Sequence, residues 1–311
     1  MRIEILGAES LGVRGLSCVV KVGNRTIVID PGVALGYRRN GLLPHPAQVA
    51  VGEEVRRNIL QALSEASDVV MSHYHGDHVP LPNANPYQLK AQRVAPLLQG
   101  CKLWTKGEAG LSDHMLRRRA ALSEALGRGL PVSEGLVDGA LSFSMSVPHG
   151  EAHSHLGTVM MTRVQGQGLV FVHASDIQLL HGEAVSKILE WAPDIALVGG
   201  PPLYLSKVMG PERRRRAWGN ARRLTEGVDT LILDHHLLRC REGVRWLDRL
   251  SSEAGQEVMC AADYMERERC LLEARREALY EEMSVPDGWH QAYGRGQADT
   301  SGYHRYVRVS T

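Results

Sequence analysis

Hydrophobic positions in the first part of the chain follow a strand pattern and then a helical one. The segments MRIEILG, SCVVKVG and TIVID are rich in β-branched residues, and Gly23-Asn24 separates the last two in the manner of a hairpin turn. Asp30-Pro31-Gly32 then ends the third strand. Residues 51–66 place Val55, Ile59 and Leu63 on one helical face. The pattern predicts a hairpin region followed by an amphipathic helix.

Short apolar runs and helical segments alternate over the rest of the chain. Residues 86–128 are predicted to be mostly helical. Strands are predicted at 68–72, 141–147, 156–164, 168–173, 194–198 and 230–234, and helices at 180–191, 211–226 and 263–284. Roughly the last 25 residues are expected to form a loosely structured tail. This order favours an α/β (α+β) fold with two mixed sheets packed face to face and helices outside.

Composition narrows the class of protein. The chain has 311 residues, of which 43% are hydrophobic and 23% charged, and this balance is typical of a folded globular chain. No internal repeat or low-complexity linker divides it, so we expect a single domain over residues 1–311. With 36 basic and 35 acidic side chains the net charge is +1, which argues against a dedicated nucleic-acid-binding protein.

The compartment is expected to be the cytoplasm. The start of the chain lacks the features of a signal peptide, and no apolar run approaches the roughly 20 residues that span a bilayer, so we expect no membrane partner. The five cysteines are widely spaced and form no C-x-x-C pair. They are expected to be reduced, as in a cytoplasmic protein.

The strongest chemical signal is a histidine cluster directly after the predicted strand at 68–72. It consists of His73, His75, Asp77 and His78. In an extended segment residues i and i+2 point the same way, so His73 and His75 can present two imidazoles to one cation. Asp77 and His78 follow as the chain turns, and they can serve a second cation. Neutral imidazole and carboxylate ligands favour zinc, with iron or manganese as the other candidates.

Further ligand candidates follow other predicted strands. His149 is the first histidine after the strand at 141–147, and His153 and His155 are the alternatives nearby. Asp176 follows the strand at 168–173, and its carboxylate could bridge two ions. His235 and His236 follow the strand at 230–234 as alternatives. Strand ends that meet at one sheet edge are where mixed α/β folds place their chemistry.

This order of residues resembles the metallo-β-lactamase-fold hydrolase superfamily. Several segments are also similar to the UPF0282 group of predicted metal-dependent hydrolases: Glu9–Gly15, Ile29–Gly32, Ser72–His78, Asp234–Arg239 and Leu272–Arg276. The resemblance covers nearly the whole chain. It implies an αββα four-layer sandwich with two metal ions, and it leaves the substrate undefined.

The resemblance also implies a ligand set. The first cation would be held by His73, His75, His149 and Asp176, and the second by Asp77, His78, Asp176 and His235. His236 remains the alternative to His235. Asp30 is expected to hydrogen-bond near the ligand loop, and a plain turn is the other interpretation of it. His173 lies within its strand and is expected to support the site or the core.

The expected activity is hydrolysis by a binuclear metal centre. Two cations would make a nucleophile from water at neutral pH, and Asp77 would orient it or accept its proton. The substrate is expected to be a small molecule with an ester, lactone or thioester bond, or a phosphodiester. An RNA or DNA phosphodiesterase and a non-catalytic metal-binding protein are the alternatives. The sequence leaves the oligomeric state open, and a homo-oligomer is compatible with it.

Overall fold

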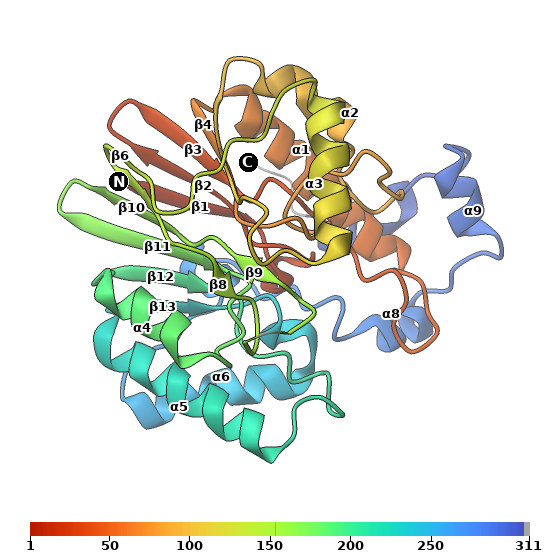
Figure 1. Cartoon of the computed structure of the whole chain (residues 1–311). Helices are drawn as coiled ribbons and strands as arrows, with labels where there is room; N and C mark the ends of the chain where they lie inside the picture. The colour runs from red at the N-terminus through yellow and green to blue at the C-terminus, as the bar shows by residue number, and fades with distance from the viewer. Residues whose placement is uncertain (153, 308–311) are drawn as a thin grey trace.

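The computed structural model describes residues 1–152 and 154–307. Its first sheet has five strands in the order β1-β2-β3-β4-β5 (Figure 1). Strands β1 to β3 are antiparallel neighbours, whereas β3, β4 and β5 run parallel. Their bounds are β1 Arg2–Gly7, β2 Ser17–Val22, β3 Arg25–Ile29, β4 Asp68–Met71 and β5 Lys102–Thr105.

The second sheet has six strands in the order β13-β12-β11-β10-β7-β6. Strands β11, β12 and β13 run parallel, and the others pair antiparallel. The bounds are β6 Val137–Asp138, β7 Leu141–Phe143, β10 Thr162–Gly166, β11 Leu169–Ser175, β12 Ile195–Val198 and β13 Thr230–Leu233. A separate hairpin pairs β8 (Val147–Pro148) with β9 (Thr158–Val159).

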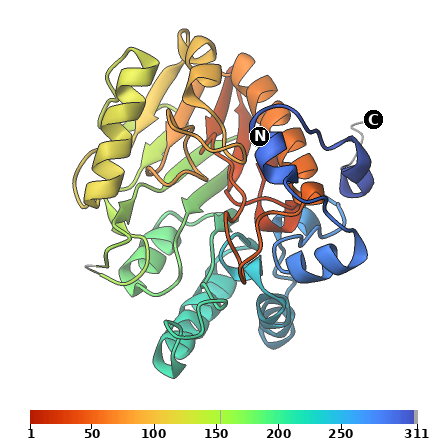
Figure 2. The same ribbon diagram turned by 90° about the vertical axis from the view of Figure 1, so that its right-hand side faces the viewer.

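Helices cover the outer faces of both sheets, as Figures 1 and 2 show. Helices α1 and α3 lie on the side of the five-stranded sheet, and α4, α5 and α6 lie against the six-stranded sheet. The helix bounds are α1 Pro46–Ser64, α2 Ala91–Val94, α3 Asp113–Leu126, α4 Gly182–Glu190, α5 Pro211–Gly227, α6 Arg241–Ala254, α7 Ala261–Tyr264, α8 Arg276–Glu282 and α9 Trp289–Gly294. Short 3₁₀ helices occupy Glu9–Leu11, Ala95–Leu98, Leu237–Arg239 and Ser301–Tyr306. The predicted αββα sandwich is confirmed.

Strand alternation divides the apolar interior into two parts. Val19, Val28 and Val69 pack with α1 residues such as Ile59 on the outer face of the five-stranded sheet. Their neighbours on the same strands, which include Val20, Ile27 and Val70, instead join the apolar residues of the other sheet. Side chains of successive strand residues point to opposite faces, so each strand contributes to both apolar layers. The two sheets are thereby held face to face.

The predicted helical region at 86–128 is only partly helical. Strand β5 interrupts it and pairs in parallel with β4. Leu103 and Trp104 are buried there, and the indole of Trp104 donates a hydrogen bond of 2.9 Å to Asp68. Burial on a sheet outweighs the helical preference of the flanking sequence, because four residues are enough for an edge strand but not for a stable helix.

The predicted helix at 263–284 is wrong, and the described part of the expected loosely structured tail contains two short helical segments. Helix α7 ends at Tyr264, Glu266 has a positive φ of 52°, and α8 starts only at Arg276. The segment between them leaves the helix because Glu273 is buried in ion pairs with Arg14 and Arg39. After α8 the chain forms α9 and the 3₁₀ helix Ser301–Tyr306, which packs against α1. Apolar contacts therefore order the described part of the tail.

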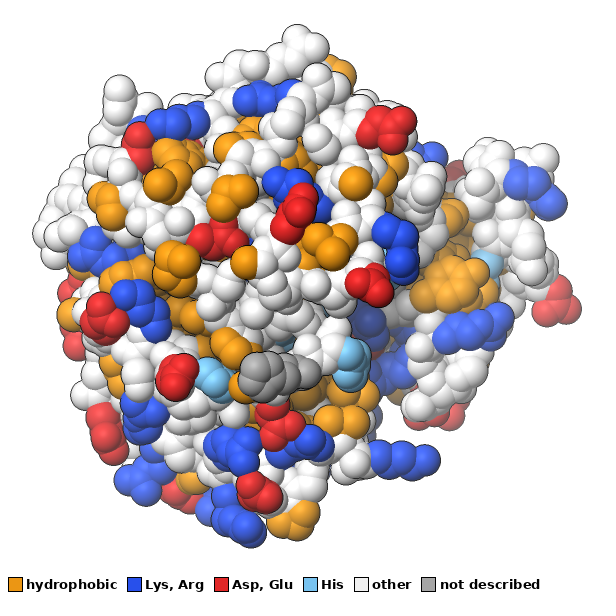
Figure 3. All heavy atoms as spheres, viewed as in Figure 1, with side chains coloured by type: hydrophobic (Ala, Val, Ile, Leu, Met, Phe, Trp, Pro, Cys, Tyr) orange, Lys and Arg blue, Asp and Glu red, His pale blue; other side chains and the backbone are white. Residues whose placement is uncertain are grey.

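Charges of both signs are interspersed over the face of the molecule seen in Figure 3. This agrees with the nearly balanced composition of the chain. None of the helices in the described residues combines the length and the apolar character that crossing a membrane requires.

Gly32 lies in the turn after β3, and we expect its substitution to destabilise the fold. A Cβ added at Gly32 would lie 2.3 Å from backbone atoms of His78 and Val79. The histidine loop, which is residues 72–79 after β4, would therefore have to move. We expect Gly32→Ala to lower the free energy of unfolding by about 1–3 kcal/mol in urea denaturation. Gly219→Ala in α5 is the control, because its Cβ meets no atom within 4 Å. Equal stability of the Gly32→Ala variant and the wild type would contradict this prediction.

Candidate metal centre

The residues with metal-binding side chains follow strand ends at one edge of the two sheets. The histidine loop follows β4, Asp176 follows β11, and His235 follows β13. Strands β3 and β4 are parallel, as are β11 and β13 through β12, so their carboxyl ends point toward the same region. His149 directly follows β8 of the small hairpin. Segments far apart in sequence thereby meet at one place.

The carboxylate of Asp176 lies at the middle of this cluster. Its Oδ2 is 2.8 Å from His149 Nε2, 3.3 Å from His73 Nε2 and 3.5 Å from His75 Nδ1. Its Oδ1 is 2.8 Å from His78 Nε2 and 3.2 Å from His235 Nε2. Each oxygen therefore faces its own set of imidazoles, which is the arrangement that a bridging carboxylate adopts between two cations.

Four overlapping groups of donor atoms among the described residues are compact enough for a cation, and two of them correspond to the two expected ligand sets. The donor atoms of His73, His75, His149 and Asp176 lie within 4.8 Å of one another. A second group within the same limit contains Asp77, His78 and His235, in which His235 Nε2 is 3.6 Å from Asp77 Oδ2. Imidazole and carboxylate donors in sets of three or four match the chemistry of zinc sites. The site can hold divalent metal.

Burial sets the protonation states that metal binding needs. Burial lowers the pKa of His73 to about 3 and that of His235 to about 4, so both imidazoles are neutral near pH 7. Burial alone would raise the pKa of Asp176, but His78, His235 and His236 outweigh it and hold that pKa well below its usual range. Neutral imidazole and ionised carboxylate are the forms that coordinate metal.

His78 is the exception, because it lies between two carboxylates. Its Nδ1 is 2.8 Å from Asp30 Oδ2 and its Nε2 is 2.8 Å from Asp176 Oδ1. Burial would lower the pKa of His78, but the two carboxylates outweigh it and raise the pKa well above its usual value. A proton therefore occupies the position beside Asp176 that a cation would take, and metal binding would displace it.

Asp30 holds the histidine cluster in place through contacts with Ser72, Ser175 and His78. It accepts hydrogen bonds from Ser72 N at 2.8 Å and from the hydroxyls of Ser72 and Ser175 at 2.7 and 2.8 Å. In neutral His78 the hydrogen bond to Asp30 would keep the proton on Nδ1, which leaves the electron pair of Nε2 free to coordinate a cation. Ser72 Oγ also lies 2.9 Å from His73 Nδ1. One buried carboxylate thus orients two imidazoles.

Three of the eight non-glycine residues with positive φ among the described residues lie at the same edge. Asp30, Ser175 and His235 have positive φ angles of 49°, 51° and 52°. Left-handed backbone is unfavourable for residues with a Cβ and persists where the surroundings impose it, often at functional sites. All three residues lie within two positions of the end of a strand, so the strained backbone turns the chain sharply where a polar side chain enters the site.

His235 and His236 both reach Asp176. His236 Nε2 is 3.4 Å from Asp176 Oδ2, and neither of its nitrogens has a hydrogen-bond partner among the described residues. The second nitrogen of His235, Nδ1, accepts a hydrogen bond of 3.1 Å from Gly15 N. His235 groups with Asp77 and His78, whereas His236 groups with His235 and Asp176. The structure therefore places both alternatives at the centre.

The remaining sequence candidates lie elsewhere. His155 is exposed and belongs to none of the donor groups found among the described residues, whereas His149 is buried at the centre. His153 lies outside the described residues. His173 is buried in β11, where its Nε2 is 2.8 Å from the carbonyl oxygen of Leu16, a contact that ties β11 to the first sheet.

Sequence reasoning missed Arg239 as a site residue. Its Nη2 lies 2.8 Å from His235 Nε2 and 3.4 Å from Asp77 Oδ2, and its Nε donates to Glu9 at 3.2 Å. Burial would lower the pKa of Arg239, but Tyr204, Glu9 and Asp77 outweigh it and raise the pKa, so the side chain is cationic. Its position only four residues after His235 is the feature of the sequence that could have identified it as a site residue.

The centre opens to solvent on one side. The side chains of His75 and Asp77 are 25% and 17% exposed, whereas those of Asp176 and His235 are buried. A substrate would therefore approach over His75 and Asp77.

Comparison with known proteins agrees with this architecture. No protein-family model matches the chain. A UPF0282 protein of Methanosarcina mazei is 51% identical over 303 residues, which are 97% of this chain and 99% of the relative. A UPF0282 protein of Methanopyrus kandleri is 35% identical and covers 90% of this chain and 99% of its own.

A solved structure supports the fold. The crystal structure of Tm1679, a metal-dependent hydrolase of the β-lactamase superfamily, matches 84% of this chain and 95% of its own with a TM-score of 0.50 and 15% identity. At this identity the likeness concerns the fold, which is the metallo-β-lactamase fold. The extent and identity of the sequence matches show that the chain belongs to the UPF0282 family.

Proposed function

We propose that this protein is a metal-dependent hydrolase with two divalent cations bridged by Asp176. The observation that carries the proposal is the division of donors around that carboxylate, since Oδ2 faces His73, His75 and His149 while Oδ1 faces His78 and His235. A structural zinc site is usually closed by four ligands. A centre with a shared carboxylate and a partly exposed side instead leaves room for substrate.

The proposed ligand sets follow the two donor groups. His73, His75, His149 and Asp176 would hold the first cation. Asp77, His78 and His235, with the other oxygen of Asp176, would hold the second. Zinc is the proposed metal because its preferred ligands are imidazole and carboxylate, and iron and manganese are the alternatives to test by reconstitution.

The residues of the chain supply the remaining parts of a hydrolytic mechanism. A pair of divalent cations polarises a carbonyl or phosphoryl group and lowers the pKa of water. Asp77 lies at the exposed side, where its carboxylate would orient the attacking water and accept its proton. The guanidinium of Arg239, 3.4 Å from Asp77, would stabilise the negative charge that develops on the substrate. Asp30 would keep His78 in the tautomer that coordinates.

A phosphodiester is the substrate class that one further observation favours. A cavity of about 440 Å³ is lined by His114, Arg117 and Arg118 of α3. Arg118 donates a hydrogen bond of 3.3 Å to the carbonyl oxygen of Tyr74, so this basic surface adjoins the histidine loop. Positive charge beside the centre suits a substrate with anionic oxygens. Esters, lactones and thioesters remain the other substrates to assay.

Metal content tests the proposed centre. We expect about two metal ions per chain in the reconstituted protein, and less than about one in the Asp176→Ala variant, because that substitution removes a ligand from both cations. Inductively coupled plasma mass spectrometry measures both values. Asp287→Ala, which removes an exposed carboxylate elsewhere, is the matched control and should keep the wild-type content. Unchanged metal content in Asp176→Ala would refute the bridging role.

Kinetics of an Arg239→Lys variant tests the proposed chemistry. We expect the metal-loaded wild type to hydrolyse bis(p-nitrophenyl) phosphate. The lysine variant should keep its metal but lose about tenfold to a hundredfold in kcat, because an ammonium cannot reproduce the guanidinium contacts. Steady-state assays of both proteins, with metal content measured on the same samples, check this. An equal kcat would rule out the role of Arg239, and a metal-loaded protein inert to phosphodiesters, esters, lactones and thioesters would favour a metal-binding protein without turnover.

A further inference from the structure

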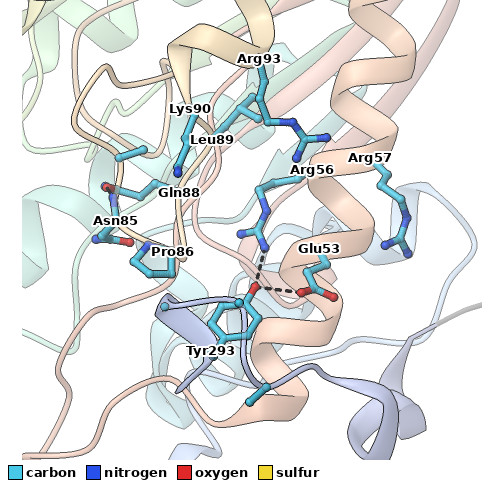
Figure 4. A pocket seen from close by; sticks show the side chains of 14 residues that line it. Glu53, Arg56, Arg57, Asn85, Pro86, Gln88, Leu89, Lys90, Arg93 and Tyr293 are labelled. Atoms are coloured by element: carbon cyan, nitrogen blue, oxygen red, sulfur yellow. Dashed lines mark hydrogen bonds between the residues drawn. The ribbon is translucent and has the colours of Figure 1, made fainter. Parts of the chain in front are cut away.

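A second basic cavity lies away from the metal centre, between α1, the segment 84–93 and the segment 293–298. We call it the arginine pocket. Its volume is about 690 Å³, and its charged lining consists of Arg56, Arg57, Lys90, Arg93 and Glu53. Figure 4 shows Arg56 and Glu53 of α1 directed toward Tyr293, with Lys90 and Arg93 on the neighbouring segment and Arg57 apart from them at the right of α1. Four cations therefore share the cavity with one carboxylate.

That carboxylate is already engaged. Tyr293 donates a hydrogen bond of 2.8 Å to Glu53 Oε1, and Thr300 donates one of 2.7 Å to Oε2 (Figure 4 shows the first). Arg57 pairs with Glu54, which lies outside the pocket lining. Among the described residues, Arg56, Lys90 and Arg93 form no ion pair with a carboxylate. The lining residues therefore carry more positive than negative charge.

Arg56 shows the consequence most clearly. Its side chain is buried, with 8% exposure, and its Nη2 donates a hydrogen bond of 3.3 Å to the hydroxyl of Tyr293. Its Nη1 has no hydrogen-bond partner among the described residues. Burial lowers the pKa of Arg56, and Tyr293 and Glu53 only partly offset this effect. A buried guanidinium without a carboxylate is costly, and an anion in the pocket would offset that cost.

We propose that the arginine pocket binds a phosphate-bearing ligand at a site separate from the metal centre. Guanidinium groups bind phosphate oxygens through paired N–H donors, and a lysine ammonium adds a compact charge. A cavity of about 690 Å³ exceeds the needs of a single phosphate ion and leaves space for the group that carries it. Pro86 and Leu89 line the pocket as apolar surface for that group.

The phosphate can come from two sources, a free phosphate ester or the backbone of a nucleic acid. Asn85 and Gln88 line both the arginine pocket and the cavity with Arg117 and Arg118 beside the histidine loop. The phosphodiester backbone of a nucleic acid would therefore contact both cavities, whereas a free ester would occupy the arginine pocket alone. In either case the chemistry recognised in the arginine pocket is a phosphoryl group.

Isothermal titration calorimetry of the metal-loaded full chain tests the proposal with inorganic phosphate as the probe. We expect the Lys90→Gln/Arg93→Gln variant to bind phosphate about tenfold more weakly than the wild type, because two charged donors are lost. Both side chains are exposed, so their replacement should leave the fold intact. Arg222→Gln on α5 removes an exposed charge elsewhere and should bind as the wild type does.

Asp176→Ala separates the two sites, since it disrupts the metal centre without touching the pocket. Phosphate binding that survives Asp176→Ala and weakens in the Lys90/Arg93 double variant supports the proposal. Binding that is lost in Asp176→Ala but unchanged in the double variant would overturn it, as would no binding at all of phosphate or of an eight-nucleotide single strand. If the double variant also binds the oligonucleotide more weakly, and if that binding weakens steeply with salt, the source of the phosphate is nucleic acid. If only the binding of inorganic phosphate is weakened, the source is a free ester.

Discussion

The buried carboxylate of Asp176 is the constraint on which the rest of the site depends. An ionised group without solvent needs partners on every side, and here imidazoles from the histidine loop, His149, His235 and His236 surround it. Burial lowers the pKa of His73, His149 and His235, so these three imidazoles are neutral near pH 7 and do not balance the charge. Two divalent cations held by the proposed ligand sets would supply that balance, with His236 beside them as the alternative to His235.

The fold meets this constraint by bringing strand ends of two sheets to one edge. Strained backbone at Asp30, Ser175 and His235 turns the chain into the site after three different strands. Asp30 then links the histidine loop to β11 through hydrogen bonds from Ser72 and Ser175. Gly32 allows the turn after β3 to pass against His78 and Val79. Stability of the sandwich and placement of the donors are therefore coupled, because the residues that join the sheets also orient the ligands.

The parts that sequence could predict are those with local signals. The spacing of His73, His75, Asp77 and His78 and the apolar runs before them indicate both the strand and the donors. Strand β5 was missed because four buried residues carry no period of their own, and the helix at 263–284 was wrong because Glu273 is drawn into contacts with Arg14. The contacts of Arg239 with Glu9 and of Arg56 with Tyr293 join residues more than 200 positions apart, so no local pattern in the sequence reveals them.

Anomalous diffraction from crystals of the zinc-reconstituted protein tests the central claim most directly. The account predicts two anomalous peaks about 3.5–4 Å apart, one beside each oxygen of Asp176. The first peak should contact His73, His75 and His149, and the second should contact Asp77, His78 and His235. A single peak, or peaks that avoid the Asp176 carboxylate, would contradict the bridged binuclear centre on which the proposed hydrolysis rests.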